Sequence, residues 1–278
     1  AVFDNQDLMR ASILTATNAH RLGANEAPPS ILSCFLGSEV SAMLDQLESQ
    51  VTDKKMTPDE KTALKLDIGK IPEILLDNTD RNRTSPFAFT GNRFEFRAVG
   101  GSANSAVPMA VLNTAMARQL REFKKDVDAL IDKDVKKDEA IFQVLREYII
   151  SSKPIRVEGD NYSEEWVKEA EKRGLTNITD VPEAIGAYLS NKSKKLFFDQ
   201  GIFDENELEG RVEVMYENYI LKIQIEARVL GDLAINHIVP TAVKYQNVLM
   251  ENVLQLKQLY GDDYKSLAGN RIELIKEI

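Results

Sequence analysis

Several residue types are scarce in this 278-residue chain, and each scarcity excludes a class of protein. One cysteine rules out an intrachain disulfide and fits a reducing compartment, so we expect a cytoplasmic location. Two histidines are too few for a histidine-based metal cluster. The net charge of -9 argues against nucleic acid and anionic membranes as partners, because both favour basic surfaces. No apolar run reaches the roughly 18 residues that a membrane span requires.

The remaining composition is that of a globular protein, with 43% hydrophobic and 28% charged residues. The single cysteine, Cys34, lies within an apolar stretch from Ile31 to Leu36. We therefore expect a buried, inert thiol there and not a nucleophile. No acidic or cysteine neighbour surrounds His237 in the sequence, so we expect a hydrogen-bonded histidine at a helix end and no site residue.

A five-residue segment that begins at Arg93 alternates charged and aromatic side chains, as a short strand does. Successive strand side chains point to opposite faces, so Phe94 and Phe96 share one face and the charged residues share the other. Both arginines can then address one bound anion, and Glu95 between Arg93 and Arg97 suits a divalent cation such as Mg²⁺ or Mn²⁺. For this pattern alone, the alternative is a solvated Arg–Glu–Arg ion-pair ladder.

Two further segments place charged side chains ahead of this strand. The first runs from Gly23 through two prolines and cannot be helix interior, because proline removes a donor and glycine favours positive φ. It is a restrained loop that presents Glu26, with Arg21 just before it. The second covers residues 80–86 and adds Arg83 immediately before an apolar turn. Each segment is common by itself, and their order along the chain is the informative feature.

That order resembles the glutamine synthetase family, specifically its long type III class. The family's carboxyl-terminal half carries an Arg-then-Glu-Ala-Pro flap, an Asn-Arg-Ser/Thr segment and an Arg-x-Glu-x-Arg strand. The corresponding segments here are Arg21 with Glu26-Ala27-Pro28, Asn82-Arg83-Thr84 and Arg93-Phe94-Glu95-Phe96-Arg97. The sequences of residues 20–29, 94–100 and 223–232 are also similar to those of type III enzymes, so the resemblance extends over nearly the whole chain.

The resemblance implies roles for the residues of the strand and of the flap. Glu95 would be a ligand of the metal ion nearest the transferred phosphoryl group. Arg97, together with Arg21 and Arg93, would bind the glutamate substrate, Arg97 through the fork geometry with which arginine pairs with carboxylates. Glu26 would close over γ-glutamyl phosphate, exclude water and help to take a proton as ammonia attacks.

Arg83 would stabilise the charge on the γ-phosphoryl group during its transfer. The implied activity is the ATP-dependent joining of glutamate and ammonia, with Mg²⁺ or Mn²⁺ as the metal and a ring-shaped homo-oligomer as the assembly. Two alternatives remain open. The enzyme could join glutamate to another amine, such as cysteine or a polyamine, or the helical region could serve assembly or regulation without chemistry of its own.

The same resemblance implies that part of the site lies elsewhere. Family members take most metal carboxylates, a metal-binding histidine and much of the nucleotide pocket from sequence upstream of the flap. Only residues 1–19 precede the flap here, so we expect a fragment with an incomplete site that is inactive alone. The expected fold class is α+β and mostly α-helical. Residues 1–122 would be the carboxyl-terminal part of the catalytic domain, and residues 123–278 a helical carboxyl-terminal region.

Apolar spacing and capping residues predict the individual elements. We expect helices over 30–49, from about 105 to 122, and within 123–150, with a shorter helix between 161 and 174. Asp180 is expected to cap a further helix, since a proline and a glutamate follow it. The longest helix should begin near Asp204 and continue past Arg228, and Pro240 should interrupt the helix that follows.

Overall fold

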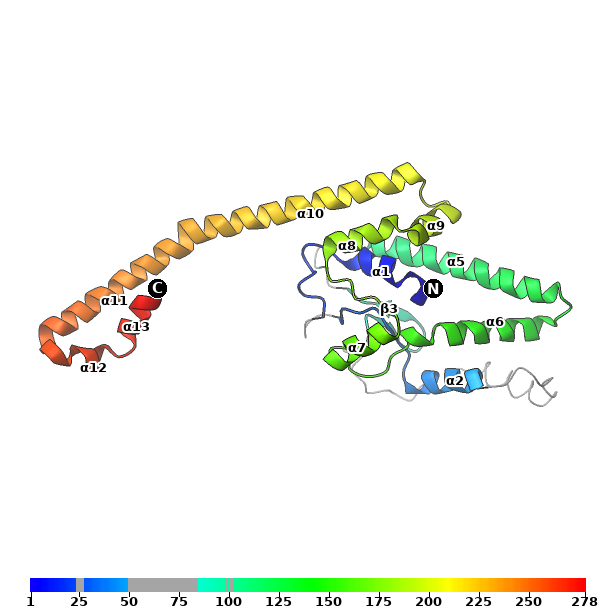
Figure 1. The fold of residues 1–278 in the computed structure, drawn as a ribbon, viewed down its shortest axis with the longest axis horizontal. Helices are drawn as coiled ribbons and strands as arrows, with labels where there is room; N and C mark the ends of the chain where they lie inside the picture. Colours follow the sequence, from blue (N-terminus) through cyan, green and yellow to red (C-terminus); the bar gives the residue numbers. More distant parts are fainter. Residues whose placement is uncertain (24–27, 50–84, 99, 101–102) are drawn as a thin grey trace. The chain divides into compact units, whose positions relative to one another are not determined.

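The computed structural model describes residues 1–23, 28–49, 85–98, 100 and 103–278. It confirms a mostly helical fold with one small sheet (Figure 1). Along the chain the elements are η1 (Phe3–Asn5), α1 (Gln6–Ile13), β1 (Cys34–Phe35), α2 (Ser38–Ser49), β2 (Phe87–Phe89), β3 (Phe94–Phe96), α5 (Ala106–Ile131), α6 (Lys137–Ser151), η2 (Lys153–Ile155), α7 (Glu164–Lys172), α8 (Val181–Gly186), η3 (Ala187–Leu189), α9 (Asn191–Asp199), α10 (Glu205–Leu233), a π-helical turn (Ala234–Ile238), α11 (Val239–Tyr260), η5 (Gly261–Asp263), α12 (Tyr264–Ala268) and α13 (Arg271–Glu277).

The chain divides into two compact units, which we call unit 1 (Ala1–Glu217) and unit 2 (Asn218–Ile278). The boundary between them lies within α10. The functional division expected near residue 122 stays a prediction, and residue 122 itself lies inside α5. Within the described ranges, no helix combines the length and the apolar character needed to cross a bilayer.

The sheet of unit 1 has the order β1-β2-β3. β1 and β2 are parallel, with Cys34 beside Phe87, whereas β2 and β3 are antiparallel, with Phe87 beside Phe96. A residue from the helical region joins the sheet at β1, where Arg156 forms an isolated parallel bridge with Cys34. The amide of the next residue, Val157, donates to the Cys34 carbonyl oxygen at 3.0 Å. Residues on both sides of position 122 therefore build this sheet.

The helix expected over 30–49 is wrong in its first part. The structure places β1 in that part, and α2 begins only at Ser38. Gly37 separates the two elements with a φ of 86°, a left-handed conformation that glycine adopts without strain. The apolar run before it is buried from Ile31 to Phe35, and Cys34 and Phe35 form β1. Short apolar runs of this kind fit a buried strand as well as a helix, so their spacing cannot separate the two.

One hydrophobic cluster holds the sheet against the helical region. Residues before and within the sheet (Ile31, Cys34 and Phe87) pack there against Ile155, Val157, Trp166, Ala170 and Leu175. The cluster thus joins segments more than a hundred positions apart, and burial of its side chains is the main source of stability at this end of unit 1. α7 is correctly predicted, and its first turn is capped by Ser163, whose hydroxyl accepts from the Trp166 amide at 3.2 Å.

The helices around this cluster follow the sequence signals closely, with one difference. Asp180 caps α8 as expected, since its carboxylate accepts from the Glu183 amide at 3.0 Å. α5 continues to Ile131, nine residues past its expected end at 122. It pairs with α6 (Figure 1) through a second cluster formed around Val127 and Val144. The predicted boundary at residue 122 therefore falls inside one continuous helix, and the chain turns only between α5 and α6.

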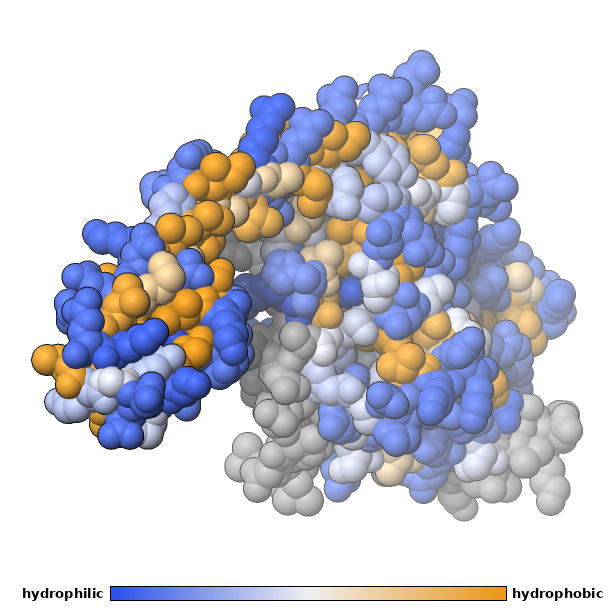
Figure 2. All heavy atoms as spheres, turned by 60° about the vertical axis from the view of Figure 1, so that its left-hand side comes forward, coloured by the Kyte–Doolittle hydropathy of each residue, from blue (hydrophilic) through white to orange (hydrophobic). Residues whose placement is uncertain are grey.

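Unit 2 consists of the last part of α10, the π-helical turn, α11 and the short helices α12 and α13, which both contact α11. The interruption predicted at Pro240 is realised as this π-helical turn immediately before α11, whose first turn holds the proline. Proline has no amide proton, so a wider turn accommodates the missing hydrogen bond without ending the helix. His237 lies exposed in the same turn. Figure 2 shows extensive apolar surface along these helices.

Candidate functional site

The topology of the small sheet brings three predicted site segments together at the same end of its strands. β1 and β2 run parallel, so the residues that precede them, Ser33 and Ser85, lie at the same end. β3 runs antiparallel, so the residue that follows it, Arg97, lies at that end as well. The Arg97 amide donates to the Pro86 carbonyl oxygen at 2.7 Å, and this bond closes the corner. We call this end of the sheet the site corner.

The base of the predicted flap enters the site corner through β1. The Gly23 amide donates to the Pro28 carbonyl oxygen at 2.9 Å, so the two ends of the loop meet. Gly23 has a φ of 88°, and a Cβ atom there would come within 3.1 Å of the Ser30 Cβ atom. The backbone therefore requires glycine at this position, as the sequence suggested. Arg21 lies exposed in the turn just before. Glu26 lies outside the described residues.

The charged face of β3 is arranged as the alternation predicts. An Nη atom of Arg97 lies 2.8 Å from one Glu95 carboxylate oxygen, and an Nη atom of Arg93 lies 3.9 Å from the other. The Arg97 side chain is 18% exposed and that of Arg93 is 72% exposed, so Arg97 is the more fixed partner. The structure thus contains the Arg–Glu–Arg ladder, and Arg97 is the member of the ladder that lies at the site corner.

The opposite face of β3 is aromatic. The Phe87 ring stacks on Phe94 with centroids 5.1 Å apart, and it meets Phe96 edge to face at 5.7 Å. Phe94 is nevertheless 47% exposed, so its replacement by alanine should cost less than the roughly 3–5 kcal/mol of a fully buried phenylalanine. This packing fixes which side of β3 carries the charges.

A buried polar network lies behind the site corner, and nothing in the sequence points to it. The Ser85 hydroxyl donates to the Ser33 carbonyl oxygen and accepts from the Phe87 amide at 2.9 Å. The side-chain amide of Asn161 donates to the Ser33 hydroxyl at 3.0 Å. Ser33 and Ser85 are fully buried, and Asn161 is 5% exposed. The partners are 52 and 128 positions apart, so no local pattern could reveal them. Arg83 precedes this network in sequence and lies outside the described residues.

Cys34 is buried next to this network, in agreement with the prediction of an inert thiol. Burial raises the pKa of the thiol to about 12, because a thiolate would lose its hydration there. The reactive thiolate is therefore absent at neutral pH. Cys34 contributes to packing and to the sheet, not to nucleophilic chemistry.

The capacity for metal binding is limited in the part of the chain that the structure describes. No three His, Cys, Asp or Glu side chains gather there in a way that could hold a metal ion. The Glu95 carboxylate is 36% exposed and offers the hard oxygen ligands that Mg²⁺ and Mn²⁺ prefer. A single carboxylate can supply one ligand of a metal site, but a complete site needs further ligands.

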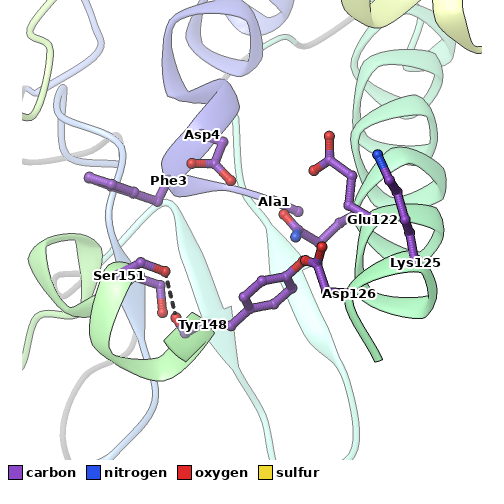
Figure 3. Close-up of a pocket in the computed structure, with 10 residues that line it drawn as sticks. Ala1, Phe3, Asp4, Glu122, Lys125, Asp126, Tyr148 and Ser151 are labelled. Carbon is purple, nitrogen blue, oxygen red and sulfur yellow. Dashed lines mark hydrogen bonds between the residues drawn. The ribbon is translucent and has the colours of Figure 1, made fainter. Parts of the chain in front are cut away.

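A pocket of about 500 Å³ lies elsewhere in unit 1, between η1, α5 and α6 (Figure 3). Its charged lining is mainly acidic, from Asp4, Glu122 and Asp126, and Tyr148 donates its hydroxyl to Asp126 at 2.8 Å. None of the predicted site residues lines it. The pocket therefore adds nothing to the chemistry expected at the site corner.

Comparisons with known proteins agree with the family resemblance of the sequence. Residues 140–257 match the family model of the glutamine synthetase C-terminal domain. The whole chain aligns with a glutamine synthetase of Bacteroides fragilis at 62% identity, over 38% of that protein. It aligns over 91% of its length with a type-3 glutamine synthetase of Dictyostelium discoideum at 39% identity, and over 95% with a glutamine synthetase of Butyrivibrio fibrisolvens at 35%.

These matches also measure how much of the relatives the chain represents. It spans between 34% and 38% of their lengths. The matched domain includes Asn161, the cluster residue Trp166 and most of unit 2, and the alignment to the Bacteroides protein includes the site corner as well. The chain thus belongs to the glutamine synthetase family and corresponds to a carboxyl-terminal portion of its members.

Proposed function

We propose that this chain supplies the glutamate-binding and flap side of a glutamine synthetase active site, which forms glutamine from glutamate and ammonia through γ-glutamyl phosphate at the expense of ATP. The observation that supports this most is the site corner, where the flap base, the segment after Arg83 and the Arg97 end of β3 meet. These three segments are separated in the sequence, and the family resemblance assigns all of them to one active site. In the structure their described ends are neighbours.

The proposed roles follow from the chemistry of each side chain. Arg97, with Arg93 and Arg21, binds the carboxylates of glutamate, for which the planar guanidinium fork is suited. Arg83 stabilises the charge that the phosphoryl group carries during transfer. Glu26 covers the γ-glutamyl phosphate, keeps water away and accepts a proton from ammonia.

Glu95 would contribute one ligand to a Mg²⁺ or Mn²⁺ ion, whose positive charge neutralises phosphate oxygens when it is bound. The other ligands and most of the ATP site would come from outside this chain, so we propose that the chain alone is inactive. A reducing, cytoplasmic location is supported by the single buried, unpaired cysteine. A ring-shaped homo-oligomer is proposed from the family resemblance.

A hybrid protein tests this proposal, with the present sequence in place of the matched region of the Bacteroides fragilis glutamine synthetase. We expect the hybrid to form glutamine from glutamate, ammonium and ATP, and we expect the 278-residue chain alone to form none. A panel with cysteine and polyamines in place of ammonium tests the alternative ligases. Glutamine-forming activity in the chain alone would contradict the proposal that the site is shared. An inactive hybrid would contradict the proposal that this chain supplies part of a glutamine synthetase site.

Glu95→Gln tests the metal role within the active hybrid. The amide is a weaker ligand than the carboxylate, so the Mg²⁺ concentration for half-maximal activity should rise at least as much as the roughly 10–100-fold effect of losing an outer-shell partner. Glu139→Gln, an exposed change in the first turn of α6, is the matched control. An unchanged Mg²⁺ requirement in Glu95→Gln would show that Glu95 serves only the ion pairs with its two arginines.

A further inference from the structure

α2 contacts the helical region through a stripe of polar side chains. Ser41, Asp45 and Glu48 follow one another at spacings of four and three residues, so they lie on one face of the helix. The Ser41 hydroxyl donates to the Glu158 carboxylate at 2.7 Å, and the two acidic side chains face Lys153. Both of these partners belong to the residues that match the family's C-terminal domain. The stripe therefore joins α2 to that domain.

Three cations of the helical region converge on the last turns of α2, and we call Arg146, Lys153 and Arg156 the clasp. Arg146 donates to the Glu48 carbonyl oxygen from Nε at 3.2 Å and from an Nη atom at 2.9 Å. Lys153 donates to the Glu48 carboxylate at 2.8 Å and lies 3.7 Å from that of Asp45. An Nη atom of Arg156 lies 3.8 Å from an oxygen of each carboxylate. Positive groups are favourable at this end of a helix, because its last carbonyl oxygens carry partial negative charge.

Apolar burial contributes less to the docking of α2 than to that of α7. No residue of α2 is buried, whereas α7 buries Trp166 and Ala170. The apolar side chains of α2 are only partly covered: Val40, Met43, Leu44 and Leu47. Elements with few buried apolar contacts open locally at a lower free energy than the core does. The charged contacts therefore have a large share in holding α2.

The charged contacts of α2 respond to salt, whereas its apolar contacts have no charge to screen. The Lys153 and Asp45 side chains are 53% and 60% exposed, so ions in the solvent reach them. The screening length falls from about 10 Å at 0.1 M ionic strength to about 3 Å at 1 M. Added salt therefore weakens the exposed part of the clasp.

We propose that the clasp latches α2 onto the family's C-terminal domain, and that this latch opens with rising salt while the apolar cluster of unit 1 stays folded. The inference does not depend on the proposed function. β1 stays in place when α2 opens, because the Val157 amide donates to the Cys34 carbonyl oxygen and both residues belong to the apolar cluster.

Hydrogen exchange in the 278-residue chain tests the latch by comparing the amides of α2 with those of α7. Raising sodium chloride from about 0.1 M to about 1 M should speed exchange in α2 severalfold and leave exchange in α7 unchanged. Unchanged or slower exchange in α2 would mean that its apolar contacts hold it, and the proposal would be overturned. Equal acceleration in α7 would mean that salt destabilises unit 1 as a whole, which also overturns the proposal.

Lys153→Met tests the clasp at constant salt, because it removes an exposed charge and keeps an unbranched apolar side chain. It should speed exchange in α2 at about 0.1 M salt and reduce the further effect of added salt. Lys168→Met is the matched control, since Lys168 is an exposed lysine of α7 outside the clasp. That control should leave exchange in α2 as it is. If Lys153→Met behaved like the control, the clasp would not hold α2 and the proposal would fail.

Discussion

The two units of this chain differ in how their apolar side chains are covered. In unit 1, Ile31 is 1% exposed because segments far apart in the sequence close over it. In unit 2, Ile235 is 71% exposed, and only Leu249 and Ala268 are buried hydrophobic residues among its positions. Unit 2 is richer in isoleucine, leucine and valine than unit 1, so the exposure of its apolar side chains does not come from a lack of them. Long-range packing stabilises unit 1, whereas unit 2 depends on local helix formation.

The sharpest test of this comparison replaces the same residue type in each unit. Ile31→Ala should lower the free energy of unfolding of unit 1 by about 2–5 kcal/mol, because it removes buried methyl groups and leaves a cavity. Ile235→Ala removes exposed groups and should change it by less than about 0.5 kcal/mol. Urea unfolding followed by tryptophan fluorescence measures this, since the only tryptophan, Trp166, lies in the cluster around Ile31.

Each result of this pair has a clear meaning. A large effect of Ile235→Ala on the Trp166 transition would mean that the stability of unit 1 depends on the exposed helices of unit 2, and the comparison would fail. A small effect of Ile31→Ala would mean that the cluster tolerates a cavity beside β1. Burial of the Ile31 side chain would then contribute less to the stability of unit 1 than its low exposure indicates.

The contrast also explains what the sequence could predict. Local signals performed well: Asp180 caps a helix, Gly23 adopts positive φ, and Pro240 disturbs a helix. Each of these effects is set by one residue and its nearest neighbours. The spacing of the apolar run at Ile31 predicts a helix, but the same spacing also fits a short buried strand. The run is a strand because it pairs with β2, which is more than fifty positions away, and with Arg156, which is more distant still.

The site shows the same limit. The alternation around Glu95 predicts the face that carries the arginines, and the structure has that face. The network of Ser33, Ser85 and Asn161 could not be predicted, because small polar residues are common and their partners are distant. Which residues act at this site remains a prediction, and the positions of Glu26 and Arg83 lie outside the described residues.

A second prediction uses pH to test burial in unit 1 directly. The folded Cys34 thiol has a pKa of about 12, so between about pH 9 and pH 11 the unfolded chain loses this proton while the folded chain keeps it. The unfolded state then binds fewer protons, and stability falls as pH rises. The loss from this group approaches about 1.4 kcal/mol per pH unit.

The measurement compares pH slopes and not absolute stabilities, since other groups titrate in the same range. Urea unfolding followed at Trp166 should show a shallower loss of stability above pH 9 in Cys34→Ala than in the unsubstituted chain. Equal slopes would mean that the Cys34 thiol reaches water in the folded state. In unit 2 no cysteine is present, so its helix content serves as an internal reference.

The smallest expected effect on stability comes from a helix cap in unit 1, which we compare with an exposed serine contact in unit 2. Ser163 accepts a hydrogen bond from the Trp166 amide at 3.2 Å, and Ser163→Ala should lower the stability of unit 1 by about 1 kcal/mol. Ser163→Asp should restore it, because aspartate also caps helices. Ser266→Ala removes a hydroxyl that donates to the Asp263 carbonyl oxygen at 2.8 Å in an exposed turn. The Trp166 transition should not respond to that change, and a shift as large as that of Ser163→Ala would mean that the two units unfold as one.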